Sequence, residues 1–328
     1  MVNLIFEIRF SDDFVLVARV WTNHAGLFTT SESDIKLEMQ SEIETIQYIA
    51  DSSSIPVPTV VDFNLDPSGP LGYRYMITTA MDGQPLGKLW TEIPTEFQRN
   101  ILGQFADYLV QLSQLRFSTI GLLRYDGHTT SIVGFSEGEK PFTTTSQYIR
   151  STREELNVKV QQDTHFGFAD DDKQVACSVL LKVATGLVQQ ETNSGPFPLM
   201  HHDLHYNNIL VDDCFNITGI VDWNGASTAP QEVFASIHGF RVPIISDKRD
   251  IYDHCRQLFV EELKMREIGR GGGILVSDWV GSDSAQCLEF SLDAHPWRAV
   301  PLAKYIVGTF PSITDGKNWE QWKELCKE

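Results

Sequence analysis

The segment HHDLHYNNILVDD, residues 201–213, brings three histidines, three aspartates and two asparagines together. Carboxylate and amide oxygens are the hard ligands that Mg²⁺ prefers, and a carboxylate left free of the metal can act as a general base. Imidazole and carboxylate groups together are ligands for zinc. The segment is therefore typical of a catalytic loop, of a metal cluster or of an ordinary polar turn.

Two short apolar runs favour the first of these interpretations. NILVD and ITGIVDW are joined by the turn-like DCFN, so we expect an antiparallel hairpin. In such a hairpin the start of the first strand lies beside the end of the second. Asn208 and Asp222 then share one end, and the loop that carries Asp203 enters there. Two carboxylates and an amide oxygen would converge, as a magnesium site requires, with Asp203 free to act as a base.

A zinc site is the main competing chemistry. It would use His201, His202, Asp203 and His205, but the order His-His-Asp-x-His lacks the paired spacing of common zinc motifs. The glycine-rich GRGGGIL at 269–275 is a second candidate for ligand binding. It lacks the GK[ST] ending of a phosphate-binding P-loop, and we expect a loop between helices.

The elements that must position the polar loop, which lies within residues 201–213, fall into two groups. Residues 3–21 alternate as a hairpin does, residues 31–51 have helical spacing, and residues 55–63 and 72–81 are typical of two further strands. After these, Pro94 opens a long helix, residues 172–190 form another, and helical patterns return from Pro230. We predict an α+β protein with a small sheet-rich lobe, residues 1–82, and a larger, mainly helical lobe, residues 83–328.

The composition limits the class of partner. The chain has 328 residues and a formal net charge of −18, which repels phosphate backbones and anionic lipid. We expect no nucleic-acid or membrane partner, and the acidic balance favours an amine-bearing substrate. No apolar run approaches the length of a membrane span, and the five cysteines contain no CxxC pair, so we expect a reduced, soluble, cytoplasmic protein. Nothing in the sequence specifies an oligomeric state.

The pattern His-x-Asp-x₄-Asn, followed by an aspartate at the end of a hairpin, resembles the protein kinase-like fold. More closely, it resembles the aminoglycoside phosphotransferase and choline kinase family, including its fungal members. QSEIETIQYIADSSSIPVPTVVDF and YMITTAMDGQPL are similar to the family's first helix with its following strand and to the segment that connects the lobes. The resemblance covers about residues 3–240. The matching residues of the motif are His201, Asp203, Leu204, His205, Asn208, Ile209, Leu210, Asp222 and Trp223.

The resemblance implies a phosphotransferase that moves the γ-phosphoryl group of ATP or GTP to a hydroxyl of a small molecule with the help of Mg²⁺. It implies that Asp203 is the base and that Asn208 and Asp222 hold the metal. Arg19 and Glu42 would form the phosphate clamp. The backbone that would bind the adenine belongs to Thr79, Ala80 and Met81. His201 is expected to hold the loop by hydrogen bonds, and the residues expected to pack are His205 and Trp223.

Two features depart from the family. Arg19 stands where most kinases carry a lysine, and its planar fork differs from a point charge. MVNLIFEI resembles the family's second strand, so the first strand and the phosphate-covering loop have no counterpart. Leu4 to Phe10 would then form an exposed apolar edge. We expect the coding sequence to begin upstream of Met1. The alternative is a catalytically inactive kinase-like protein that binds a nucleotide or a metabolite.

Overall fold

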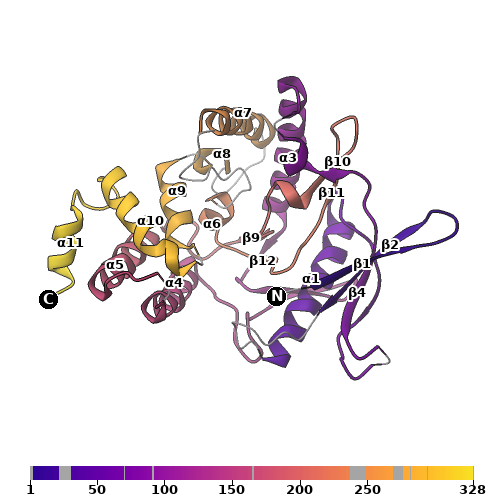
Figure 1. Cartoon of the computed structure of the whole chain (residues 1–328), viewed down its shortest axis with the longest axis horizontal. Helices are drawn as coiled ribbons and strands as arrows, with labels where there is room; N and C mark the ends of the chain where they lie inside the picture. Colours follow the sequence, from indigo (N-terminus) through magenta and orange to yellow (C-terminus); the bar gives the residue numbers. More distant parts are fainter. Residues whose placement is uncertain are drawn as a thin grey trace.

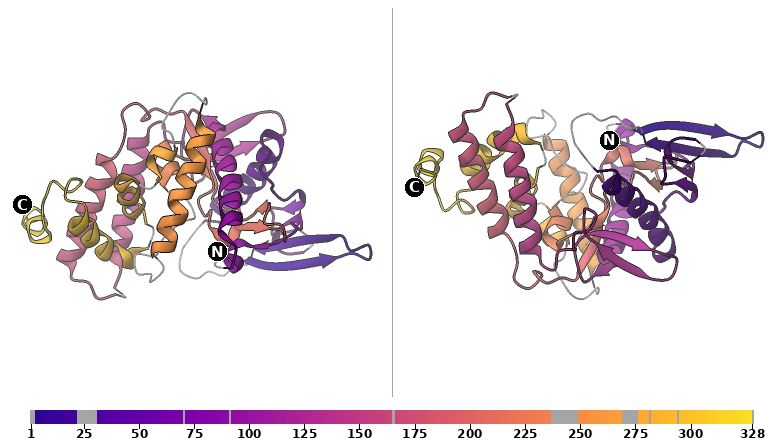
Figure 2. Two further views of the ribbon diagram at one scale, coloured as in Figure 1. Left: turned by 90° about the horizontal axis from the view of Figure 1, so that it is seen from above. Right: turned by 90° about the horizontal axis from the view of Figure 1, so that it is seen from below.

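The chain folds into a small antiparallel sheet with one long helix, followed by a larger and mainly helical part (Figure 1). The sheet and α11 (Trp319–Leu325) lie at opposite ends of the molecule (Figure 2). The division into an α+β arrangement is the one predicted from the sequence, while the boundary at residue 82 stays a prediction. The computed structural model describes residues 3–21, 31–69, 71–90, 92–164, 166–236, 249–268, 276–280, 282–293 and 295–327. For residues 249–253 it describes the backbone and not the side chains.

The small sheet has four strands and one covering helix. Its strands are β1 (Asn3–Arg9), β2 (Val15–Trp21), β3 (Val60–Asn64) and β4 (Arg74–Thr79), and all pairs are antiparallel in the order β1-β2-β4-β3. The helix is α1 (Glu32–Ser52), which begins where the Ser31 hydroxyl accepts a hydrogen bond from the Asp34 amide. The expected hairpin, helix and two strands are thus confirmed. The apolar stripe of α1 is buried at Met39, Ile43, Ile46 and Ile49.

Strand β1 forms one edge of this sheet, and its side chains are largely exposed. Among them Ile5 is 69% exposed and Phe6 51%. The structure thus bears out the apolar edge that the sequence predicts. In Figure 2 the β1–β2 hairpin projects away from the body of the molecule.

Short strands lead from the sheet into the helical part. β5 (Gln84–Pro85) pairs with β10 (Ile209–Val211), which also pairs with β11 (Ile217–Ile220). This pairing ties the connecting segment to the hairpin that carries the polar loop. The other short strands are β6 (Arg116–Phe117), β7 (Leu122–Tyr125), β8 (Thr130–Val133), β9 (Phe197–Met200) and β12 (Ser227–Thr228).

Helices make up most of the remainder. α3 (Thr95–Gln114) begins directly after Pro94, as predicted, and α5 (Asp170–Gly186) covers most of the helix expected at 172–190. The others are α2 (Leu86–Leu89), α4 (Thr145–Gln162), α6 (Gln231–Ser236), α7 (Arg249–Glu267), α8 (Val276–Trp279), α9 (Asp283–Ser291) and α10 (Pro296–Thr309). The expectation for GRGGGIL lies outside the described residues. Across the described ranges, no helix combines the length and the apolar character that a membrane span needs.

Two hydrophobic clusters support these elements. The first joins α1, α3, α7 and the strands on either side of the polar loop, with Phe105, Ile220 and Trp223 fully buried in it. The second lies among α4, α5, α9, α10 and α11, around Val179 and Ile306. The polar loop therefore rests on the first cluster, which spans the sheet and the helical part together.

Gly83, in the connecting segment, approaches the β10–β11 hairpin closely. Its φ is +106°, and a Cβ there would lie 2.6 Å from the carbonyl oxygen of Val211. We expect Gly83→Ala to lower the free energy of unfolding by about 2 kcal/mol, because conformational strain and a clash with backbone coincide. Urea denaturation measures this loss. Gly127→Ala is the matched control: its φ is +89° but nothing lies within 4 Å of an added Cβ. Equal losses in both variants would contradict the close approach.

Candidate functional site

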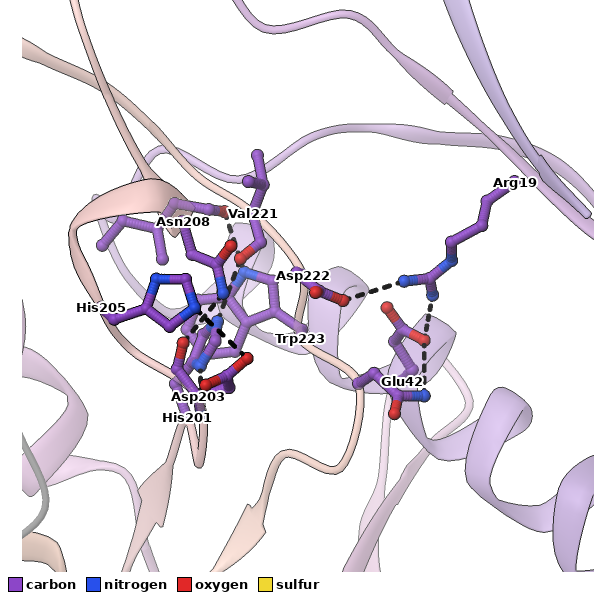
Figure 3. A network of polar contacts seen from close by, with 11 residues as sticks. Arg19, Glu42, His201, Asp203, His205, Asn208, Val221, Asp222 and Trp223 are labelled. Carbon is purple, nitrogen blue, oxygen red and sulfur yellow. Dashed lines mark hydrogen bonds and ion pairs between the residues drawn. The ribbon is translucent and has the colours of Figure 1, made fainter. Parts of the chain in front are cut away.

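The β10–β11 hairpin brings the predicted site residues to one end (Figure 3). Ile209 pairs with Ile220, and one step further the amide of Val221 donates to the carbonyl oxygen of Asn208 at 3.0 Å. Asn208 ends the short 3₁₀ turn η1 (Tyr206–Asn208), and Asp222 directly follows Val221. Asn208 and Asp222 thus share one end of the hairpin, as the sequence predicts.

His201 fixes the loop that carries Asp203. Its Nδ1 accepts from the Asp203 amide at 3.2 Å, and its Nε2 therefore donates to the carbonyl oxygen of Val221 at 3.1 Å. The ring packs against Trp223, which is fully buried. Burial lowers the pKa of His201, so the ring is neutral at pH 7. The predicted role of His201 as a hydrogen-bonding support is confirmed, as is the packing of Trp223.

Asn208 holds the same loop from the other side. Its Nδ2 donates to the carbonyl oxygen of Asp203 at 2.8 Å. The backbone of Asp203 is therefore fixed at both its N–H and its C=O. Its side chain, by contrast, is 63% exposed.

Arg19, from β2, joins the helix α1 to the hairpin. Its guanidinium forms ion pairs with Glu42 and, at 3.1 Å, with Oδ1 of Asp222. It also lies over the ring of Trp21, 4.4 Å from the centroid. Asn224 adds a contact that the sequence did not suggest, since its Nδ2 donates to Glu42 Oε2 at 3.4 Å. Figure 3 shows Arg19 reaching toward both carboxylates.

Glu42 is almost completely buried, with 2% of its surface exposed. Burial raises the pKa of Glu42, and the neighbouring Arg19 opposes the rise. A buried carboxylate of this kind needs its cationic partner, because breaking a buried pair leaves an uncompensated charge. The contact between α1 and β2 therefore depends on Arg19.

The segment predicted to bind adenine lies at the end of β4. The amide of Thr79 donates to the carbonyl oxygen of Thr59 at 2.9 Å, and that of Ala80 donates to the carbonyl oxygen of Val15 at 3.1 Å. These two donors are already engaged within the sheet. For the Met81 amide, no backbone partner is found in the part of the chain that the structure describes. Adenine binding by this segment stays a prediction, with Met81 as its remaining amide donor.

The available oxygens fit a magnesium ion. The Asp222 carboxylate is 47% exposed, and the amide of Asn208 uses its nitrogen on Asp203, which leaves its oxygen as an acceptor. Carboxylate and amide oxygens are the ligands that Mg²⁺ prefers. Among the residues that the structure describes, no group of three or more His, Cys, Asp and Glu side chains is arranged to hold a metal. The histidines bind protein groups instead, with His202 Nε2 at 2.7 Å from the Ser227 hydroxyl.

His205 is not a packing residue, and that prediction is wrong. Its side chain is 41% exposed, and its Nε2 lies 3.5 Å from Oδ2 of Asp203. Its Nδ1 accepts from the amide of Asn207 at 3.1 Å, which caps the turn η1. A histidine two residues after the aspartate could have indicated this contact, but only the backbone path of the loop decides which way the ring points.

Burial of His202 predicts a pH-dependent stability. Burial lowers the pKa of His202 to about 4 from its ordinary value of 6.5. The unfolded chain then binds a proton below pH 6.5 that the folded chain takes up only near pH 4, so stability falls as the pH falls through this window. The full loss is roughly 3 kcal/mol. We expect His202→Asn to flatten the dependence in urea denaturation between pH 7 and 4.5. Parallel pH profiles for the two proteins would contradict this.

A family model described as "Phosphotransferase enzyme family" matches residues 17–232 of the chain, well over half of its length. The match includes residues 17–21 of β2 with Arg19, the helix α1, and the whole of the polar loop and its hairpin.

Two curated fungal proteins are similar to this chain. A subtelomeric hrmA-associated cluster protein of Aspergillus fumigatus is 22% identical over 309 residues, which cover 73% of this chain and 58% of that protein. Clavilactone A biosynthesis cluster protein Y of Ampulloclitocybe clavipes is 26% identical over 254 residues, which cover 70% of this chain and 59% of that protein. The chain thus spans less than two thirds of the length of these relatives.

Solved structures of low sequence identity share the fold. A macrolide 2′-phosphotransferase type I has a TM-score of 0.53 at 11% identity, with 99% of this chain and 86% of that chain covered. A GDP and kanamycin complex of APH(2″)-IIIa has a TM-score of 0.53 at 13% identity, with 99% of this chain and 91% of that chain covered. The fold is therefore the two-lobed, kinase-like fold of these phosphotransferases, as the sequence predicted.

Proposed function

Since the chain belongs to the phosphotransferase enzyme family, we propose that it transfers the γ-phosphoryl group of ATP or GTP to a hydroxyl of a small molecule. The observation that carries this proposal is the convergence at one end of the β10–β11 hairpin. Asp203, Asn208 and Asp222 meet there, and the ion pair of Arg19 and Glu42 adjoins them.

Asp203 would act on the acceptor. In the proposed step the acceptor oxygen forms a bond to the γ-phosphorus while the bond from that phosphorus to the β,γ-bridging oxygen breaks, and the nucleoside diphosphate leaves. The proton of the hydroxyl passes to the carboxylate of Asp203. The exposure of this carboxylate, on a backbone held by His201 and Asn208, supports the assignment because it lets an acceptor approach a fixed base.

Asp222 and Asn208 would hold Mg²⁺ through their side-chain oxygens. When bound, the ion offsets negative charge on the nucleotide phosphates. Arg19 supplies a further fixed positive charge beside Asp222, and Glu42 orients it from the buried side. The backbone of residues 79–81, with Met81 as the available amide donor, is the proposed contact for the base of the nucleotide.

The acceptor is proposed to be a small molecule that bears an amine as well as a hydroxyl. The net charge of −18 supports this, because an acidic surface attracts a cationic substrate. One solved relative is described in complex with kanamycin and GDP. We propose further that the protein acts in the cytoplasm, without a nucleic-acid or membrane partner.

An inactive nucleotide-binding protein is the second candidate. One observation favours it: Arg19 already supplies Asp222 with a cationic partner, so the guanidinium competes with a metal ion for that carboxylate. A protein of this kind would bind a nucleotide or a metabolite without turnover. Phosphoryl transfer to an acceptor separates the two candidates.

Thermal melts with ATP and GTP, with and without Mg²⁺, test the nucleotide site that both candidates share. Saturation at 100 times the dissociation constant stabilises a protein by about 2.7 kcal/mol. We expect one or both nucleotides to raise the melting temperature, and the rise to be larger with Mg²⁺ than with a chelator. Unchanged melts with either nucleotide at millimolar concentration would overturn the phosphotransferase and the nucleotide-binding form of the second candidate.

A further inference from the structure

We propose that His205 is a positioning residue that holds the carboxylate of Asp203 in one orientation. The inference rests on the proposed function, in which Asp203 takes the proton of the acceptor. It adds a residue whose side chain has no part in the metal site or in the nucleotide contacts proposed above.

The surroundings of Asp203 leave its carboxylate in need of such a partner. Hydrogen bonds to His201 and from Asn208 fix only its backbone. The carboxylate is 63% exposed, and among the described residues its recorded partner is His205 Nε2, at 3.5 Å from Oδ2. A base that rotates freely places its oxygen correctly only part of the time, which lowers the rate of a step that depends on orientation.

The ring of His205 has a defined hydrogen-bonding direction. Nδ1 accepts from the amide of Asn207, so this nitrogen carries no hydrogen, and the neutral ring carries its hydrogen on Nε2. Nε2 lies 3.5 Å from Oδ2 of Asp203, and Figure 3 marks this contact between the two side chains. A separation of 3.5 Å is long for a hydrogen bond, and catalytic contacts of this kind shorten when the substrate is bound.

The two nitrogens of His205 therefore link two parts of the site. Through Nδ1 the ring caps η1, the turn that ends at Asn208. Through Nε2 it faces the carboxylate of Asp203. With Oδ2 directed to His205, Oδ1 is the oxygen left for the acceptor hydroxyl. The geometry assigns to the His205 ring the role of fixing the Asp203 carboxylate relative to the turn η1.

Two substitutions separate these contacts. In His205→Gln the amide nitrogen is as many bonds from Cβ as Nε2 is, so the contact with Asp203 remains and the cap is lost. In His205→Asn the amide oxygen takes the place of Nδ1, so the cap remains and the contact with Asp203 is lost. If the ring positions the base, His205→Asn lowers kcat about tenfold at unchanged nucleotide KM. His205→Gln keeps most of the kcat of the parent protein.

A role confined to the fold gives the opposite order. His205→Gln would then melt lower and be the less active variant, while His205→Asn would match the parent protein in both measurements. That result overturns the proposal. The same holds if both variants lose activity equally.

A spectroscopic measurement tests the contact without any turnover. Long-range ¹H–¹⁵N correlation spectra in mildly alkaline buffer, assigned by the signal lost in His205→Gln, report which ring nitrogen carries the hydrogen. We expect Nε2–H, with a resonance that shifts in Asp203→Asn. A hydrogen on Nδ1, or a resonance indifferent to Asp203, refutes the positioning role. If the spectra agree with the proposal and no acceptor is phosphorylated, the proposed function fails while the contact stands.

Discussion

Asp203→Asn is expected to slow phosphoryl transfer by roughly 10² to 10⁴ while the affinity for the nucleotide stays nearly the same, the usual effect of removing a positioned general base. The physical reason is local. The side chain of Asp203 is exposed, and the backbone of its loop is held by His201 and Asn208, so the substitution removes a proton acceptor and leaves the loop in place. Single-turnover rates and nucleotide titrations measure the two quantities separately.

Asp213→Asn is the matched control for this substitution. It makes the same change of charge in an exposed residue of the β10–β11 turn, at the far end of the hairpin from Asn208. We expect its rate and its nucleotide affinity to equal those of the parent protein. If Asp203→Asn loses nucleotide affinity in proportion to its rate, Asp203 belongs to the nucleotide site and the assigned role is wrong.

Asp222→Asn is expected to weaken nucleotide binding in the presence of Mg²⁺ by tenfold or more. Replacing groups that only support a metal ligand already costs about 10- to 100-fold in metal affinity, and Asp222 would be a ligand itself. The loss should vanish when a chelator removes the metal. Isothermal titration with ATP or GTP, with Mg²⁺ and then with chelator, gives both values.

The same substitution removes the ion pair with Arg19, so its stability must be measured in parallel. Glu42 remains as a partner of Arg19 in the variant, and we therefore expect the fold to persist. An equal weakening of nucleotide binding with and without Mg²⁺ would mean that Asp222 acts through Arg19 and not through a metal ion.

Local sequence patterns were sufficient to predict the elements around the site. The alternation in residues 3–21 and the two apolar runs that flank DCFN depend on neighbours in sequence, and the structure has both hairpins. The resemblance to the family carried the remaining information, since it implied that Arg19 and Glu42 pair although one lies on β2 and the other on α1.

Contacts that depend on the exact path of the backbone could not be predicted. Asn224 reaches Glu42 across 182 residues of sequence, and its role needs the turn that follows Trp223. The motif fixes the position of His205 in the chain and not the direction of its ring, so the sequence does not reveal its contact with Asp203. In the same way, the register of β4 against its neighbours decides that Thr79 and Ala80 use their amides within the sheet.

Phosphorylation of an acceptor is the most direct test of the central claim. The protein is incubated with Mg²⁺, ATP or GTP, and a panel of hydroxyl-bearing amines that includes kanamycin, and mass spectrometry then detects acceptors that have gained one phosphoryl group. The account predicts at least one phosphorylated acceptor, formed by the parent protein and by Asp213→Asn but strongly reduced with Asp203→Asn. Nucleotide binding without any phosphorylated acceptor, or equal product from Asp203→Asn, would contradict it.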